Sequence, residues 1–305
     1  MTTTLTAKAP EDVLAAVPVV LGFAPQDSLV MLTFGGAEQF HARLDLPPGP
    51  AEIPPCVDAV LRPALTQRVR GVVFVLYAAD ALLARALAEE LTERFEAYRI
   101  RVIDCLRVHD GRWFAPTGRP GVPDHGVPFD IADHEFRAAA VLDGRVTLGS
   151  RAELAAQVAA DTAMVAETEA ALTDAEPLSL SGAVGLVSRS LSRGRAGDAE
   201  DLASLLLALR DPKVRDQAWS GLRREEAPAH VALWTDVVRR APEELVADPA
   251  AILAFAAWLR GDGALAWCAL DRCLAVDPGH RLGGMVARVL AEAVPPSAWE
   301  ECAGA

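Results

Sequence analysis

The chain has 305 residues, of which 51% are hydrophobic and 23% are charged. This composition predicts one large domain or two of ordinary size, and it excludes an intrinsically disordered chain. The formal net charge of −13 at pH 7 disfavours sequence-independent binding to nucleic acid and to anionic membranes, because both are themselves acidic.

The five cysteines form no CxxC pair, which favours a reducing compartment over a disulfide framework. The start of the chain lacks the pattern of a signal peptide. The apolar stretch 13–25 is interrupted by Pro18 and is too short to span a bilayer. We therefore expect a soluble, cytoplasmic protein that makes no contact with a membrane.

The chain opens with a predicted helix and a predicted hairpin. The helix is expected over 9–17, where Pro18 ends or kinks it. The apolar run 28–34 and the alternating run 40–46 predict two strands joined across Gly35 and Gly36. In the second strand Phe40, Ala42, Leu44 and Leu46 are expected to face the core, and His41 the surface.

The next segments predict a βαβ unit. The expected elements are a helix over 54–67, a strand over 72–77, a helix over 81–97 capped by Asp80, a strand over 99–108 and a short strand over 111–114. Two apolar strands on either side of a helix indicate a right-handed crossover between parallel strands.

A loop rich in glycine and proline follows over 116–130 and is typical of a lid, a binding loop or a flexible flap. A short helix is predicted over 131–142. A long alanine-rich helix is predicted over 151–172, within a segment 151–175 that links the α/β domain of residues 1–150 to an all-helical domain of residues 176–305.

The second domain contains no convincing strand. Its predicted helices are 180–192, 198–209, 212–223, 228–240, 249–260, 264–276 and 280–293. The hairpin 250–278 places Ala266, Leu270 and Pro278 where a tetratricopeptide repeat has its small, bulky and helix-ending residues. A plain pair of antiparallel helices explains the same pattern.

The stretch 9–34 contains the pattern L-G-F-x-P-x-x-S-L-V, formed here by Leu21, Gly22, Phe23, Pro25 and the run 28–30. It resembles the opening of the actinobacterial domain-of-unknown-function 4192 family. The closing segments FAAWLRGDGALAWCALDRCLAVDPGHRL and PPSAWE resemble the end of that family. The resemblance spans nearly the whole chain. It implies no activity, because none is assigned to the family, and no catalytic residue carries over.

One candidate site comes from a carboxylate in an apolar strand. Ile100, Val102, Leu106 and Val108 share a face of an ideal strand 99–108, and Asp104 lies among them. A buried carboxylate needs a partner or a raised pKa. Because ligands bind beyond the carboxyl ends of strands in open α/β sheets, Tyr77, Asp80 and Asp104 could line one crevice. The alternative is a bulge that turns Asp104 outward, with Asp80 acting only as a helix cap.

A second candidate is a divalent metal site in the acidic segment 124–135, with His125, His134 and Asp130 as ligands. No known metal motif matches its spacing, and a solvated acidic loop explains it equally. The chain has neither a Walker lysine nor a dinucleotide-binding glycine loop, so no cofactor is expected.

Two functions from different classes fit these features. The first is a non-catalytic interaction or regulatory protein that binds a protein partner through its helical half. The second is a hydrolase that uses Asp104 with Asp80 and Tyr77, with or without a metal. The sequence carries no signal of an oligomeric state.

Overall fold

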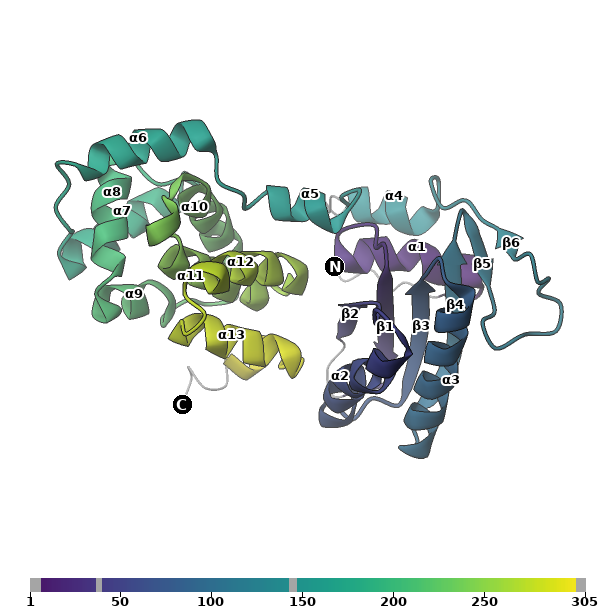
Figure 1. Ribbon diagram of the computed structural model, residues 1–305. Helices are drawn as coiled ribbons and strands as arrows, with labels where there is room; N and C mark the ends of the chain where they lie inside the picture. The colour runs from purple at the N-terminus through teal and green to yellow at the C-terminus, as the bar shows by residue number, and fades with distance from the viewer. Residues whose placement is uncertain (1–6, 37–39, 143–146, 300–305) are drawn as a thin grey trace. The chain divides into compact units, whose positions relative to one another are not determined.

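The computed structural model describes residues 7–36, 40–142 and 147–299. The chain divides into two compact units, Met1–Arg151 and Ala152–Ala305. The first contains a mixed sheet with helices, and the described residues of the second form helices and loops alone (Figure 1). The predicted α/β part and helical part are thus both present.

A six-stranded sheet with the order β2-β1-β3-β4-β5-β6 forms the centre of the α/β unit. Its strands are β1 (Ser28–Phe34), β2 (His41–Asp45), β3 (Gly71–Tyr77), β4 (Arg101–His109), β5 (Arg112–Phe114) and β6 (Val127–Pro128). Among the six described strands, β3 and β4 are paired in parallel, and the helix α3 (Ala81–Ala97) joins them. The other neighbours are antiparallel. Both the hairpin and the βαβ unit are confirmed.

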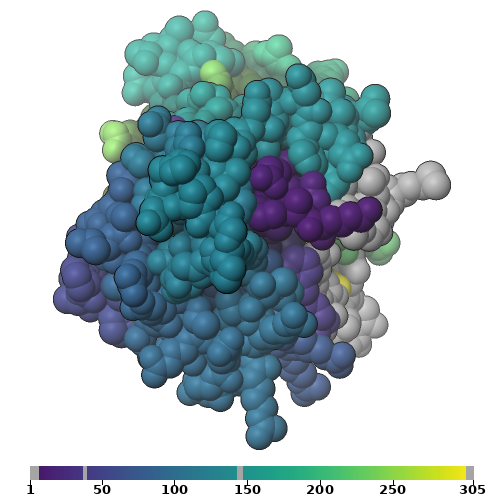
Figure 2. Space-filling view, turned by 90° about the vertical axis from the view of Figure 1, so that its right-hand side faces the viewer, coloured from purple at the N-terminus to yellow at the C-terminus, as the bar shows by residue number. Residues whose placement is uncertain are grey.

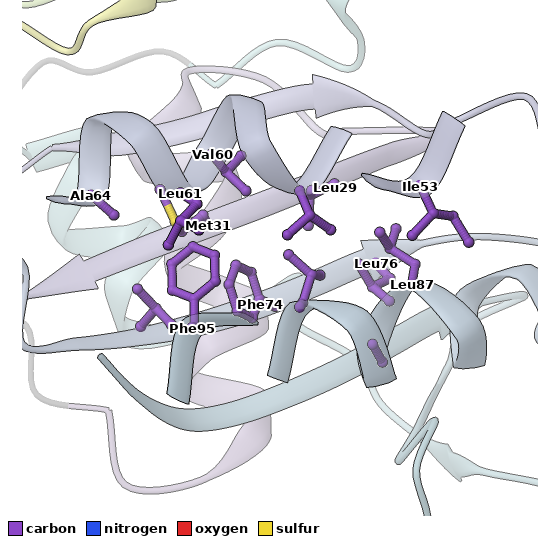
Figure 3. Packing of buried hydrophobic residues seen from close by; sticks show 14 of the residues in the cluster. Leu29, Met31, Ile53, Val60, Leu61, Ala64, Phe74, Leu76, Leu87 and Phe95 are labelled. Atoms are coloured by element: carbon purple, nitrogen blue, oxygen red, sulfur yellow. The ribbon is translucent and has the colours of Figure 1, made fainter. Parts of the chain in front are cut away.

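Two helices cover one face of this sheet and build the larger core. After a short 3-10 turn, Pro50–Glu52, α2 (Ile53–Thr66) packs beside α3 on Met31, Phe74 and Leu76 of the central strands (Figure 3). Phe95 of α3 meets Phe74 edge to face, with ring centroids 5.0 Å apart. The inward residues predicted for β2, among them Phe40 and Leu46, pack against this core.

The opposite face of the sheet is covered by α1 (Pro10–Leu21), whose Val13, Leu14 and Val17 pack on β1, β3 and β4. The helix α4 (Glu135–Leu142) packs beside α1. In Figure 2 the first described residues, in purple, lie against teal residues of the chain.

Two expectations for this region need correction. Of the two alternatives given for Pro18, an end of the helix is wrong, because the first helix continues to Leu21 and stops at Gly22, where φ is +79°. His41 is half-buried rather than on the surface, because α1 contacts β2 on the face that His41 shares with Leu32. Burial lowers the pKa of His41 to about 4, and no described residue forms a hydrogen bond with its Nδ1.

The helical unit follows the predicted pattern of helices closely. After α5 (Arg151–Ala156) at the boundary come α6 (Thr162–Leu172), α7 (Leu180–Leu191), α8 (Ala199–Leu209), α9 (Pro212–Trp219), α10 (Ala227–Arg240), the 3-10 turn Glu243–Leu245, α11 (Ala247–Arg260), α12 (Gly263–Val276) and α13 (Arg281–Ala291). No helix within the described ranges is long and apolar enough for a membrane span.

The single linking helix expected over 151–172 is wrong. The chain leaves helical conformation after α5 and starts again at Asp161, whose side chain accepts a hydrogen bond from the amide of Met164 and caps α6. α6 packs against α8 and α10, so it is part of the helical unit. The local cap at Asp161 therefore outweighs the high helix propensity of the alanines before it.

Candidate functional site

Asp104, the leading candidate of the sequence, is half-buried and paired. Its side chain is 17% exposed and forms an ion pair with Arg119 of the glycine and proline loop. Its Oδ1 also accepts a hydrogen bond from the amide of Cys105 at 2.8 Å. These contacts supply the partners that a partly buried carboxylate requires. The ion pair with Arg119 holds the glycine and proline loop against the middle of β4.

A bulge in β4 changes the face on which Asp104 lies. Val102 pairs with Val72, but the next pairing joins Asp104 to Val73, so that Ile103 is an extra residue. Before the bulge, Ile100 and Val102 pack towards α2 and α3; after it, Leu106 and Val108 pack towards α1. The prediction that these four residues share one face with Asp104 is therefore wrong.

The structure does not gather Tyr77, Asp80 and Asp104 into one crevice. Tyr77 pairs with Val108, whereas Asp104 pairs with Val73, four residues earlier on β3. At about 3.3 Å per residue these positions lie roughly 13 Å apart along the sheet. Asp80 caps α3, where its Oδ1 accepts the amides of Leu82 and Leu83 at 2.8 and 3.1 Å. Burial raises the pKa of the Tyr77 hydroxyl, which keeps it protonated.

The proposed metal ligands do not meet either. Both ring nitrogens of His134 are engaged, Nε2 with Asp12 at 3.1 Å and Nδ1 with the amide of Phe136 at 3.2 Å. Asp130 accepts the amide of Ala132 with its Oδ1, and the carbonyl of His125 accepts Arg112. In the part of the chain that the structure describes, no three His, Cys, Asp or Glu side chains form a group that would hold a metal ion.

The helical unit contains an open pocket of about 220 Å³ between α7, α8, α9 and the start of α10. Its walls are mainly aliphatic. The apolar lining comprises Ala183, Val184, Val187 and Leu191 of α7, Leu205 and Leu209 of α8, Val214 and Ala218 of α9, and Leu222. Leu180 and Val184 of α7 remain 45% exposed beside it, so apolar surface extends from the pocket onto α7. We call this the α7–α9 groove.

Few polar groups reach the α7–α9 groove. His230 lies at its wall, accepts the indole N–H of Trp234 at 3.3 Å with its Nδ1, and is neutral at pH 7 because burial lowers its pKa. Of the lining residues, Glu226 alone carries a formal charge at that pH. The groove therefore offers an apolar surface with a single negative group at its wall.

The family model Domain of unknown function (DUF4192) matches residues 10–297, nearly the whole chain. The chain belongs to this family. No curated protein and no solved structure matches it.

The α7–α9 groove of this DUF4192 chain was not predicted from the sequence. The one signal for it is an apolar face of α7 with helical spacing, made of Leu180, Val184, Val187 and Leu191. In an ordinary core helix, all four of these side chains would be buried. Only the packing of α7 on its neighbours reveals that Leu180 and Val184 stay partly exposed. Arg107, which lies between the apolar Leu106 and Val108 of β4, was missed as well.

Proposed function

We propose that this DUF4192 chain is a non-catalytic interaction protein whose helical unit binds an amphipathic helix of a protein partner. The observation that carries the proposal is the α7–α9 groove, an aliphatic pocket that continues into exposed leucine and valine side chains. An amphipathic helix that lies in a hydrophobic groove is a common mode of peptide recognition, with bulky anchors spaced one turn apart.

The size of the pocket favours a side chain over a metabolite as its occupant. Small-molecule sites usually measure roughly 300–1,000 Å³. The pocket here is about 220 Å³. An aliphatic cavity of roughly 150 Å³ admits a benzene molecule, so one aromatic or branched side chain would fill the present pocket.

The charge of the groove specifies the partner further. Glu226 is an exposed residue at the edge of the groove, where its Oε2 accepts the amide of Arg223, and an opposite charge next to the anchor would complement it. We therefore expect the partner helix to carry a bulky apolar residue with a lysine or arginine one turn away. The neutral state of His230 keeps a second charge from opposing this cation.

The stacking of the later helices is in keeping with this role. α10 packs on α11, α11 on α12, and both α11 and α12 on α13, as in arrays of helix hairpins. The sequence of this array also contains Ala266, Leu270 and Pro278, the residues that match the tetratricopeptide pattern noted above. We infer a repeat-like scaffold that presents α7 and α9 to a partner.

The test compares the capture of a protein partner by the full-length wild-type chain and by its variant Val184→Asp. Val184 is 45% exposed, so an aspartate there leaves the core intact while it places a charge on the apolar groove. We expect a stoichiometric partner to bind the wild type and to be lost from Val184→Asp, and Glu226→Lys to weaken its binding as well.

The matched control is Leu82→Asp, which makes the same kind of change at an 80% exposed leucine of α3. This variant should retain the partner fully. The proposal fails if the wild type captures nothing beyond what Val184→Asp captures, or if Leu82→Asp loses the partner to the same extent.

A further inference from the structure

Arg107 of β4 is a buried cation that forms no ion pair with any residue the structure describes. Its side chain is 8% exposed, and it lies near the carboxyl end of β4, opposite Leu76 of β3. Among the described residues, no hydrogen bond or ion pair involves its guanidinium group, and its Nε is buried without a partner. Other buried arginines of the chain do have such partners: Arg240, for example, binds Asp236 and the carbonyl of Gly197. A buried charge that lacks a partner is costly, which singles out Arg107.

An aromatic platform holds the guanidinium group of Arg107 in place. Its central carbon lies 4.2 Å from the centre of the Phe114 ring, and the two residues pair across β4 and β5. The ring packs closely against Gly126, where a Cβ atom would lie only 2.6 Å from the ring. The planar face of the guanidinium is thus supported, while its N–H edge is left for another acceptor.

The surroundings of Arg107 are those of an anion site. It lies at the carboxyl edge of the parallel pair β3 and β4, which is where open α/β sheets bind ligands. The 17-residue helix α3 begins at the same edge, and its amino end carries a partial positive charge. The charge of Asp80, the cap of α3, acts on Arg107, but the two side chains form no ion pair.

We propose that Arg107, seated on Phe114 beside the amino end of α3, binds a small anion, either a phosphate or a carboxylate group. The site lies in the α/β unit and is independent of the function proposed for the helical unit. The guanidinium group would bind the anion through charge-assisted hydrogen bonds, which are strongest for oxyanions of planar or tetrahedral geometry. The Asp80 carboxylate opposes the anion, so its charge should weaken binding.

The experiment measures the melting temperature of the full-length protein in sodium phosphate, sodium acetate and sodium chloride at equal ionic strength, with calorimetric titration for the Kd. We expect phosphate, acetate or both to stabilise the wild type saturably beyond chloride. An effect of phosphate alone assigns the site to phosphate groups, and an effect of acetate assigns it to carboxylates.

Two variants separate a site from a general salt effect. Arg107→Met keeps the length and the packing of the side chain, and it should weaken the Kd by roughly tenfold or more. Asp80→Asn preserves the helix cap, since asparagine caps as well as aspartate, and should tighten binding by removing the opposing charge. The proposal is overturned if neither anion stabilises the wild type beyond chloride, if Arg107→Met responds as the wild type does, or if Asp80→Asn binds the anion more weakly.

Discussion

The two units bury their apolar surface in different ways. In the α/β unit, large side chains such as Phe74 and Phe95 fill the space between the sheet and its two covering helices. In the helical unit, α11 is buried on all sides from Pro249 to Leu259 and is rich in alanine, so neighbouring helices approach it closely. The first core is filled by large residues between a sheet and helices, whereas the second combines the small residues of α11 with buried aromatic side chains such as Trp234 and Phe255. Polar side chains cap helices in both units, and the helical unit also leaves an aliphatic groove open.

The largest expected effect is the loss of an aromatic side chain from the α/β core. Phe95→Ala removes the edge-to-face contact with Phe74 and leaves a cavity between α3 and the sheet. We expect this variant to lower the free energy of unfolding of the α/β unit by about 3–5 kcal/mol. Urea denaturation followed by circular dichroism measures it. Leu82→Ala on the same helix is the control, because that leucine is 80% exposed and its loss should cost less than about 0.5 kcal/mol.

The half-buried His41 predicts a pH dependence that is confined to the α/β unit. Its folded pKa is about 4, against 6.5 for the exposed side chain, because burial disfavours the charged ring. Between these two values the unfolded chain binds a proton that the folded chain does not, so stability falls as the pH is lowered from 6.5 to 4. The loss should reach roughly 3 kcal/mol near pH 4.

The measurement compares the pH dependence of unfolding for the wild type and for His41→Leu, which cannot be protonated. The carboxylates titrate alike in both proteins, so the difference between the two curves reports His41. Parallel curves from pH 7 to pH 4 would show that the ring is as accessible to protons in the folded chain as in the unfolded one.

The stability of the helical unit should be sensitive to added side-chain volume in its core. Ala254 in the middle of α11 is fully buried, and a leucine there has no room without shifts of α10 or α12. Ala254→Leu should destabilise the helical unit by about 1–3 kcal/mol. Ala166→Leu makes the same change at an exposed alanine of α6 and serves as the control for thermal denaturation. An Ala254→Leu variant as stable as the wild type would contradict the close packing around α11.

Local signals explain why the helices of the second unit could be predicted within a few residues. Asp198, Asp211 and Asp262 each accept a backbone amide two or three residues further on, and these caps are readable from the sequence itself. The βαβ unit could be predicted for a similar reason, because its apolar runs and the cap at Asp80 are also local.

Contacts between distant residues explain which features of the fold could not be decided from the sequence. The bulge at Ile103 depends on Gly71 of the neighbouring strand, where a Cβ atom would lie 2.9 Å from the Ile103 side chain. The burial of His41 depends on α1, and the openness of the groove depends on how α7 packs on α8 and α9. None of these pairings is marked by a motif. The candidate site residues were therefore placed on an ideal strand that the fold does not contain.

The smallest expected effect concerns the ion pair between Asp104 and Arg119. Asp104→Asn keeps the size of the side chain but removes its charge, and Arg119 is 37% exposed, so we expect a loss of only about 1 kcal/mol. The consequence should be local: amide exchange should increase at Gly118 and Val122, whose hydrogen bonds to Ala115 and Arg119 shape the loop. Hydrogen-exchange mass spectrometry of the loop measures this, with the β3 peptide as the internal reference. Arg119→Gln should have the same effect, and the double variant should add nothing to it, because both changes remove one interaction. Equal exchange in all four proteins would mean that the loop is held by its backbone turns and by Arg112, which binds the carbonyls of His125 and Gly126.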